Sequence, residues 1–179
     1  PTPRYRSSLL EDPKRPLWKK IIRRESMDVD VVDAHGHMGP NGIWMVERQE
    51  VADQIPAALA AMDRLGIRTF CVSGMEALHG DPVEGNRTIA RFLKPHGDRF
   101  RGWIVANPYF MDRLEPLMEE FLADPFFIGF KLLGSYWGGP MTDSRYEPVW
   151  RHAHTHRCPI LLHTWDGAKV CNPAILADI

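Results

Sequence analysis

The feature that most constrains the fold is a regular alternation of short apolar segments with helical segments along most of the chain. Five segments are short, apolar on both faces and rich in Val, Ile, Leu and Phe, as expected for buried β-strands. They are residues 28–34, 67–72, 101–106, 127–133 and 159–163. Helical segments follow them at residues 47–65, 81–92, 112–123, 146–155 and 172–179. This order predicts an α/β protein whose parallel strands are joined by right-handed helical crossovers.

Two architectures share this alternation, the doubly wound sheet and the barrel. A doubly wound sheet would normally place a glycine-rich phosphate loop after its first strand. Residues 35–37 instead read His-Gly-His. We therefore expect a TIM-like (β/α)8 barrel of about 250 residues, of which this chain contains about five βα units. The expected barrel portion covers residues 27–179 and follows a basic N-terminal extension at residues 1–26.

Composition narrows the classes of partner. The chain has 22 Lys and Arg against 23 Asp and Glu, which gives a net charge of −1. This charge provides no overall electrostatic attraction to nucleic acid or to an acidic membrane surface. The basic residues gather near the start, where residues 1–25 carry a balance of +5. No apolar run approaches the ~18 residues of a membrane span. The three cysteines form no C-x-x-C pair, which favours a reducing, cytoplasmic location over a disulfide framework.

The sharpest chemical signal is the DAHGH run at residues 33–37, at the end of the first expected strand. Residues i and i+2 of a strand face the same side, so His35 and His37 would project together into the barrel mouth and could share one metal ion. Neutral imidazole binds zinc and similar metals, and Asp33 could orient one of the rings. His163 ends the fifth strand and is a third candidate ligand. The alternative for His163 is a hydrogen-bonded core histidine.

Lys131 is the one charge in the apolar segment FFIGFKLL at residues 126–133. A lysine buried in a strand has to be paired or neutral. Three roles stay open: a carbamylated bridge between two metals, a cation that binds a substrate carboxylate, and a structural partner for Asp33.

Aromatic residues follow three of the expected strands. Trp44, Trp137 and Trp165 would supply flat apolar walls to a substrate pocket, together with Tyr136. Aromatic side chains folded onto the barrel rim are the equal alternative.

A second histidine cluster occupies the fourth helical segment, at His152, His154 and His156. Alternate residues of a helix diverge by ~200°, so only His152 and His156 could share a face. We expect a solvated or capping cluster there, not a metal site.

Taken together, these segments resemble the metal-dependent amidohydrolase superfamily, in particular its amidohydrolase 2 branch. The resemblance runs from about residue 28 to the last residue and rests on VVDAHGHMG (31–39), GFKLL (129–133), DSRYEPVWRHA (143–153) and PILLHTWDG (159–167). It implies a TIM-like barrel holding one or two divalent metals, usually zinc, through His35, His37 and His163. Lys131 matches a position that is a metal-bridging lysine in some relatives. The family also uses a sixth-strand histidine and an eighth-strand aspartate, which five βα units do not include.

The resemblance implies hydrolysis of C–N or C–O bonds, or non-oxidative decarboxylation of a small acid, aromatic in some relatives. The expected partner is a small-molecule substrate, with no nucleic acid and no membrane. Five units would make about five-eighths of a barrel, so a second hypothesis is a catalytically silent binding or assembly module, completed by a second copy in a homo-oligomer or by another chain. A third is another barrel hydrolase family that begins with H-x-H.

Overall fold

The computed structural model describes residues 19–20, 23, 25, 29–40, 50–164 and 170–178. The expected basic extension therefore lies almost wholly outside the described residues. Within them, one sheet has the strand order β1-β2-β3-β4-β5, and each strand is parallel to its neighbours. The strands are β1 (Val31–Met38), β2 (Ile67–Gly74), β3 (Phe100–Val105), β4 (Phe127–Leu132) and β5 (Ile160–Leu162). All five overlap the segments expected from the sequence.

Six α-helices and five short 3-10 segments join or follow the strands in the described part of the chain. The α-helices are α3 (Val51–Leu65), α4 (Met75–His79), α5 (Pro82–Leu93), α6 (Met111–Leu114), α7 (Met118–Ala123) and α8 (Glu147–His156). The 3-10 segments are η1 (Lys94–Arg99), η2 (Pro108–Phe110), η3 (Glu115–Leu117), η4 (Ser144–Tyr146) and η5 (Pro173–Asp178). None of the described helices has the length and apolar character needed to cross a bilayer.

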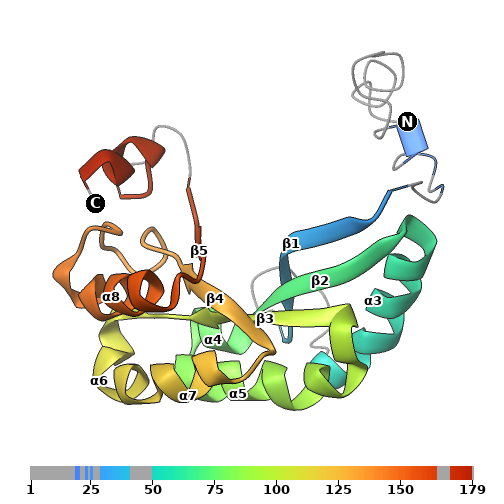
Figure 1. The fold of residues 1–179 in the computed structure, drawn as a ribbon, viewed down its shortest axis with the longest axis horizontal. Helices are drawn as coiled ribbons and strands as arrows, with labels where there is room; N and C mark the ends of the chain where they lie inside the picture. Colours follow the sequence, from blue (N-terminus) through green and yellow to red (C-terminus); the bar gives the residue numbers. More distant parts are fainter. Residues whose placement is uncertain are drawn as a thin grey trace.

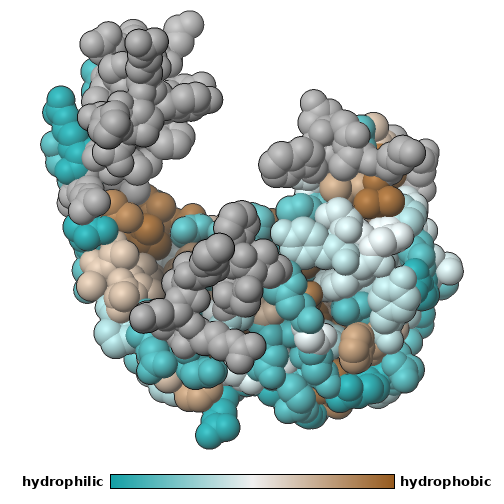
Figure 2. All heavy atoms as spheres, turned by 180° about the vertical axis from the view of Figure 1, so that it is seen from behind, coloured by the Kyte–Doolittle hydropathy of each residue, from teal (hydrophilic) through white to brown (hydrophobic). Residues whose placement is uncertain are grey.

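The sheet curls, and its helices lie on the convex outer side (Figure 1). The strands follow one another in chain order around this curl, as they do in a barrel. Seen from behind in Figure 2, the molecule is hollowed on the open side of the curl. The chain therefore forms part of a TIM-like barrel, as the alternation of its segments predicts.

The main core lies between the convex face of the sheet and the helices. Phe100, Ile104 and Phe130 point outward from their strands and are fully buried. Helix α5 covers them with Ile89 and Leu93, which are also buried. This packing holds the helices against the outside of the curl and leaves the inner face for other contacts.

Three helical segments differ from the sequence expectation. The single helix expected over 112–123 is broken into α6, η3 and α7, because Pro116 has no N–H and its ring clashes with the preceding turn. The segment expected as a helix at 172–179 is the 3-10 segment η5, which Pro173 opens. Helix α4 was not expected, since its five residues are too few to show a helical period.

Candidate active site

The first strand carries a β-bulge at the histidine motif. Asp33 pairs with Phe70 and Gly36 with Val72, so β1 advances three residues where β2 advances two. A Cβ on Gly36 would lie 1.9 Å from a ring carbon of Phe70, so a side chain at this position would force that ring to move. The strand continues to Met38, which places the motif inside β1 instead of after it.

The bulge brings the two imidazoles of the motif together. The ring centroids of His35 and His37 are 5.1 Å apart, with an edge-to-face angle of 74°. The pKa values of His35 and His37 are both lowered, mainly by partial desolvation, and the pKa of His37 falls to about 4. The positive charge of Lys131 lowers both pKa values further. A hydrogen bond with the backbone of Ser73 opposes this shift at His37. Both imidazoles are therefore neutral near pH 7, the form that binds metals.

Lys131 lies beside this pair from β4 and is fully buried. Its Nζ is 3.1 Å from Nε2 of His35. Burial lowers the pKa of its amine to about 8. The structure places Lys131 beside His35, a neighbour that the sequence did not suggest for it. Asp33 instead accepts a hydrogen bond from the backbone N–H of His35, at 3.1 Å, and does not hold the imidazole ring.

His163 directly follows β5, where its backbone N–H donates to Leu132 at 3.0 Å. Desolvation is the main cause that lowers its pKa, and the charge of Lys131 adds to it. The charge of His163 also lowers the pKa of His35 and of His37. All three histidines therefore lie at one end of the sheet. This is the carboxyl end of the strands, where barrel enzymes place their active residues.

The residues fit a divalent metal by the chemistry of their donors, which are neutral imidazole nitrogens. A hydrogen bond from a ligand histidine to backbone is the usual device that orients such a ring, and His37 has one with Ser73. Among the described residues, no three His, Cys, Asp or Glu side chains are already grouped closely enough to hold one ion. The histidines therefore match a metal site in kind and in strand position, without a preformed set of three.

Of the aromatic residues expected to line a pocket, Trp44 and Trp165 lie outside the described residues. Trp137 packs on the buried apolar residues of α4 and β3, and its Nε1 donates to the carbonyl of Leu78 at 3.3 Å. Tyr136 is 55% exposed, and its ring stands 5.8 Å from that of His79 and 5.2 Å from that of His163. Tyr136 is therefore the aromatic side chain that the described structure places directly beside a predicted ligand.

Two residues near the site escaped sequence reasoning. His79 ends α4, a helix with no recognisable sequence period. Ser73 lies in β2 and is fully buried. A serine near the end of an apolar strand was the one available signal, and serine is too common there to stand out.

The second histidine cluster forms a link between two helices. His152 and His156 stack with ring centroids 6.3 Å apart, as their spacing on one helix face predicts. Their Nε2 atoms lie 3.2 and 3.0 Å from the carboxylate oxygens of Glu119 in α7. The cluster is therefore a polar contact between α7 and α8 on the outside of the curl.

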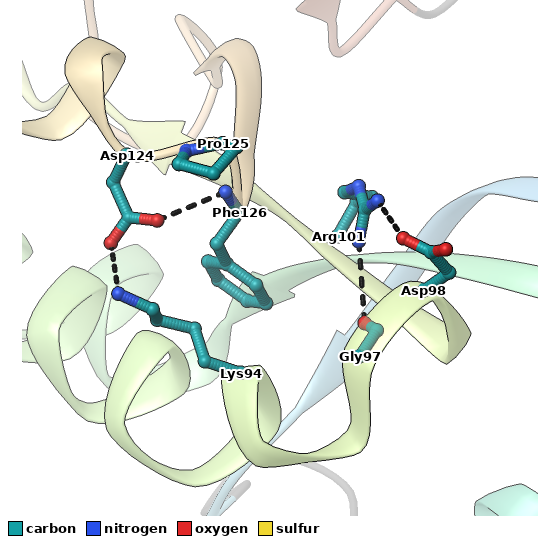
Figure 3. Close-up of a pocket in the computed structure, with 7 residues that line it drawn as sticks. All are labelled: Lys94, Gly97, Asp98, Arg101, Asp124, Pro125 and Phe126. Atoms are coloured by element: carbon teal, nitrogen blue, oxygen red, sulfur yellow. Dashed lines mark hydrogen bonds and ion pairs between the residues drawn. The ribbon is translucent and has the colours of Figure 1, made fainter.

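A pocket of about 280 Å³ lies at the opposite end of the sheet (Figure 3). Its charged groups pair with one another: Lys94 with Asp124, and Arg101 with Asp98. Phe126 of this pocket directly precedes β4, which places the pocket at the amino ends of the strands. That end of a barrel serves stability, so the histidines mark the better candidate for an active site.

Comparison with known proteins agrees with the fold. Residues 32–178 match the model of the amidohydrolase family. The chain therefore belongs to the amidohydrolase family. No curated protein matches it at a significant level.

Several solved structures share the fold at low identity. They include 5-carboxyvanillate decarboxylase from Novosphingobium aromaticivorans, complexed with manganese and 4-hydroxy-3-methoxy-5-nitrobenzoic acid (19% identity, TM-score 0.51, 68% of this chain and 38% of that one). A probable 2-pyrone-4,6-dicarboxylic acid hydrolase from Acinetobacter baumannii, with citric acid bound, is 12% identical (TM-score 0.57, 76% and 50%). The 2,6-dihydroxybenzoate decarboxylase from Rhizobium is 16% identical (TM-score 0.55, 83% and 53%). This chain thus spans about half or less of each structure.

Proposed function

We propose that the protein is a metal-dependent enzyme that acts on a small acid, either as a hydrolase or as a non-oxidative decarboxylase. The observation that carries the proposal is the pair of neutral imidazoles, His35 and His37, beside the buried amine of Lys131 at the carboxyl end of the sheet. Membership of the amidohydrolase family supports it. So do the acids named for the solved structures of the same fold.

We assign the metal to His35, His37 and His163, with further ligands outside these five βα units. Zinc is our first expectation, because imidazole nitrogens suit it, and manganese is the alternative that a solved neighbour suggests. When bound, a divalent metal polarises the substrate and lowers the pKa of a bound water. Lys131 would supply positive charge for the carboxylate of the acid, and Tyr136, whose ring lies beside that of His163, would present a ring face to its organic part.

The test is metal content. The purified chain and the His35→Ala/His37→Ala variant are loaded with Zn²⁺ or Mn²⁺, desalted and measured by mass spectrometry. We expect the variant to lose the bound metal, because two of the three assigned ligands are gone. A His152→Ala/His156→Ala variant is the matched control and should keep its metal. Equal metal content in all three proteins would contradict the ligand assignment.

The reaction type is tested separately with 5-carboxyvanillate, 2,6-dihydroxybenzoate and 2-pyrone-4,6-dicarboxylate. Release of CO₂ from the first two indicates decarboxylation, and opening of the pyrone ring indicates hydrolysis. Lys131→Met should lower kcat/KM on whichever acid is accepted, because the carboxylate loses its cation. If metal binds and none of the three acids reacts, the proposed substrate class is wrong for these acids while the metal assignment stands.

A further inference from the structure

Ser73 lies on the inner face of the curl, beside the histidines. It is fully buried and pairs in register with His37 across β1 and β2. Its chain neighbour Val72 is buried in the main core on the helix side of the sheet. Because successive residues of a strand point to opposite faces, the side chain of Ser73 faces the inner side, where the candidate site is.

The hydroxyl of Ser73 has no hydrogen-bond partner among the residues that the structure describes. A buried hydroxyl left without a partner costs about 1–3 kcal/mol. The buried side-chain amide of Asn86 on α5, by contrast, is satisfied: it accepts from the N–H of Val105 at 2.9 Å and donates to the carbonyl of Val105 at 3.1 Å. Arg99, Ser135 and Tyr146 also have a buried side-chain atom without a partner among the described residues. Of these four residues, Ser73 is the one that pairs in register with a predicted metal ligand.

We propose that the Ser73 hydroxyl is a further substrate-binding group, which donates a hydrogen bond to an oxygen of the acid bound beside His37. The proposal rests on the proposed function, since it supplies the acid. A hydroxyl binds a carboxylate oxygen without adding charge, whereas Lys131, on β4 of the same inner face, supplies the positive charge. The bound acid thereby supplies the hydrogen-bond partner that the Ser73 hydroxyl lacks among the described residues.

The test compares two deletions of a hydroxyl from the same strand. Ser73→Ala removes the unpartnered hydroxyl. Thr69→Val removes a hydroxyl that donates to the carbonyl of Asp98 at 3.0 Å, toward the other end of β2. Calorimetric titration of the metal-loaded chain uses two probes, 4-hydroxy-3-methoxy-5-nitrobenzoate and citrate. Urea unfolding gives the stability of each variant.

We expect opposite patterns. Ser73→Ala should raise the Kd of the bound probe by about five- to tenfold, the equivalent of one hydrogen bond, and leave the urea midpoint unchanged or higher. Thr69→Val should lower the urea midpoint and leave the Kd unchanged. A Ser73→Ala variant that binds as wild type does would overturn the role of Ser73 while the proposed function stands. A Ser73→Ala variant as destabilised as Thr69→Val would show a structural role and also overturn it. If the metal-loaded wild type binds neither probe, the proposed acid site itself fails, and Ser73 with it.

Discussion

At the residue scale, Gly36 shapes the candidate site without any chemistry of its own. It sits in the β-bulge of β1, between the two histidines, and the ring of Phe70 occupies the space where its side chain would be. The bulge re-aims the side chains around it, which is a common use of bulges near active sites. The spacing of His35 and His37 thus depends on a glycine and on the aromatic ring that covers it.

We predict that Gly36→Ala destabilises the protein by about 1–3 kcal/mol, because the added methyl group overlaps the Phe70 ring. Urea unfolding measures the loss. A smaller ring-free side chain should relieve the overlap, so Gly36→Ala combined with Phe70→Leu should cost less than the sum of the two single changes. Simple additivity of the two costs would show that the ring is not the obstacle.

At the element scale, the start of α8 is held by one aspartate. Asp143 caps η4 by accepting from the backbone N–H of Arg145 at 2.9 Å, and its two carboxylate oxygens accept from Nε and Nη2 of the same residue at 2.8 and 2.7 Å. The guanidinium contact is the main cause that lowers the pKa of Asp143 to about 2. The local sequence D-S-R contains all of these groups, so this element start needs no distant partner.

This arrangement predicts a pH-dependent stability. The pKa of Asp143 lies below its usual value of 3.8, so its ionised form stabilises the fold above that pH, and the contribution is lost as the pH falls towards 2. The advantage of wild type over Asp143→Asn in unfolding free energy should therefore shrink from pH 4.5 to pH 2.5. Urea titrations at several pH values measure it. The shrinkage should be weaker in an Arg145→Met background, and an equal slope there would argue against the ion pair as its cause.

At the scale of the whole molecule, Trp103 ties the inner face of the curl together. It lies on β3, and its indole Nε1 donates to the carbonyl of Ala34 on β1 at 3.0 Å, past the intervening strand β2. Ala34 directly precedes His35 inside the bulge. The hydrogen bond therefore couples the curvature of the sheet to the position of the histidine pair.

We predict that Trp103→Phe costs about 1 kcal/mol of stability and weakens metal binding several-fold, because the bulge loses its hydrogen bond to the indole. Trp150→Phe is the matched control. The Nε1 of Trp150 donates to the carbonyl of Met141 at 3.2 Å, near α8 and away from His35 and His37. The control should lose similar stability and keep the metal affinity of wild type. Equal metal affinities in the two variants would show that the indole of Trp103 does not affect metal binding.

The order of strands and helices was predictable because apolar runs and capping residues are local signals. Asp81 shows this well: it accepts from Val83 at 2.9 Å and begins α5 where the Asp-Pro pair predicts. The break at Pro116 and the helix α4 were missed. A proline inside an amphipathic run can kink or end a helix, and five residues carry no period.

The sequence by itself determined the barrel class and the family, because these depend on residue type and on the order of strands and helices. It also predicted imidazole ligands on the first and fifth strands. Only the tertiary structure decided which groups meet: Lys131 with His35, Trp103 with Ala34, and a buried Ser73 with no partner among the described residues. Such contacts join strands far apart in the chain. They depend on the curl and the bulge of the sheet, which no local pattern of residues encodes.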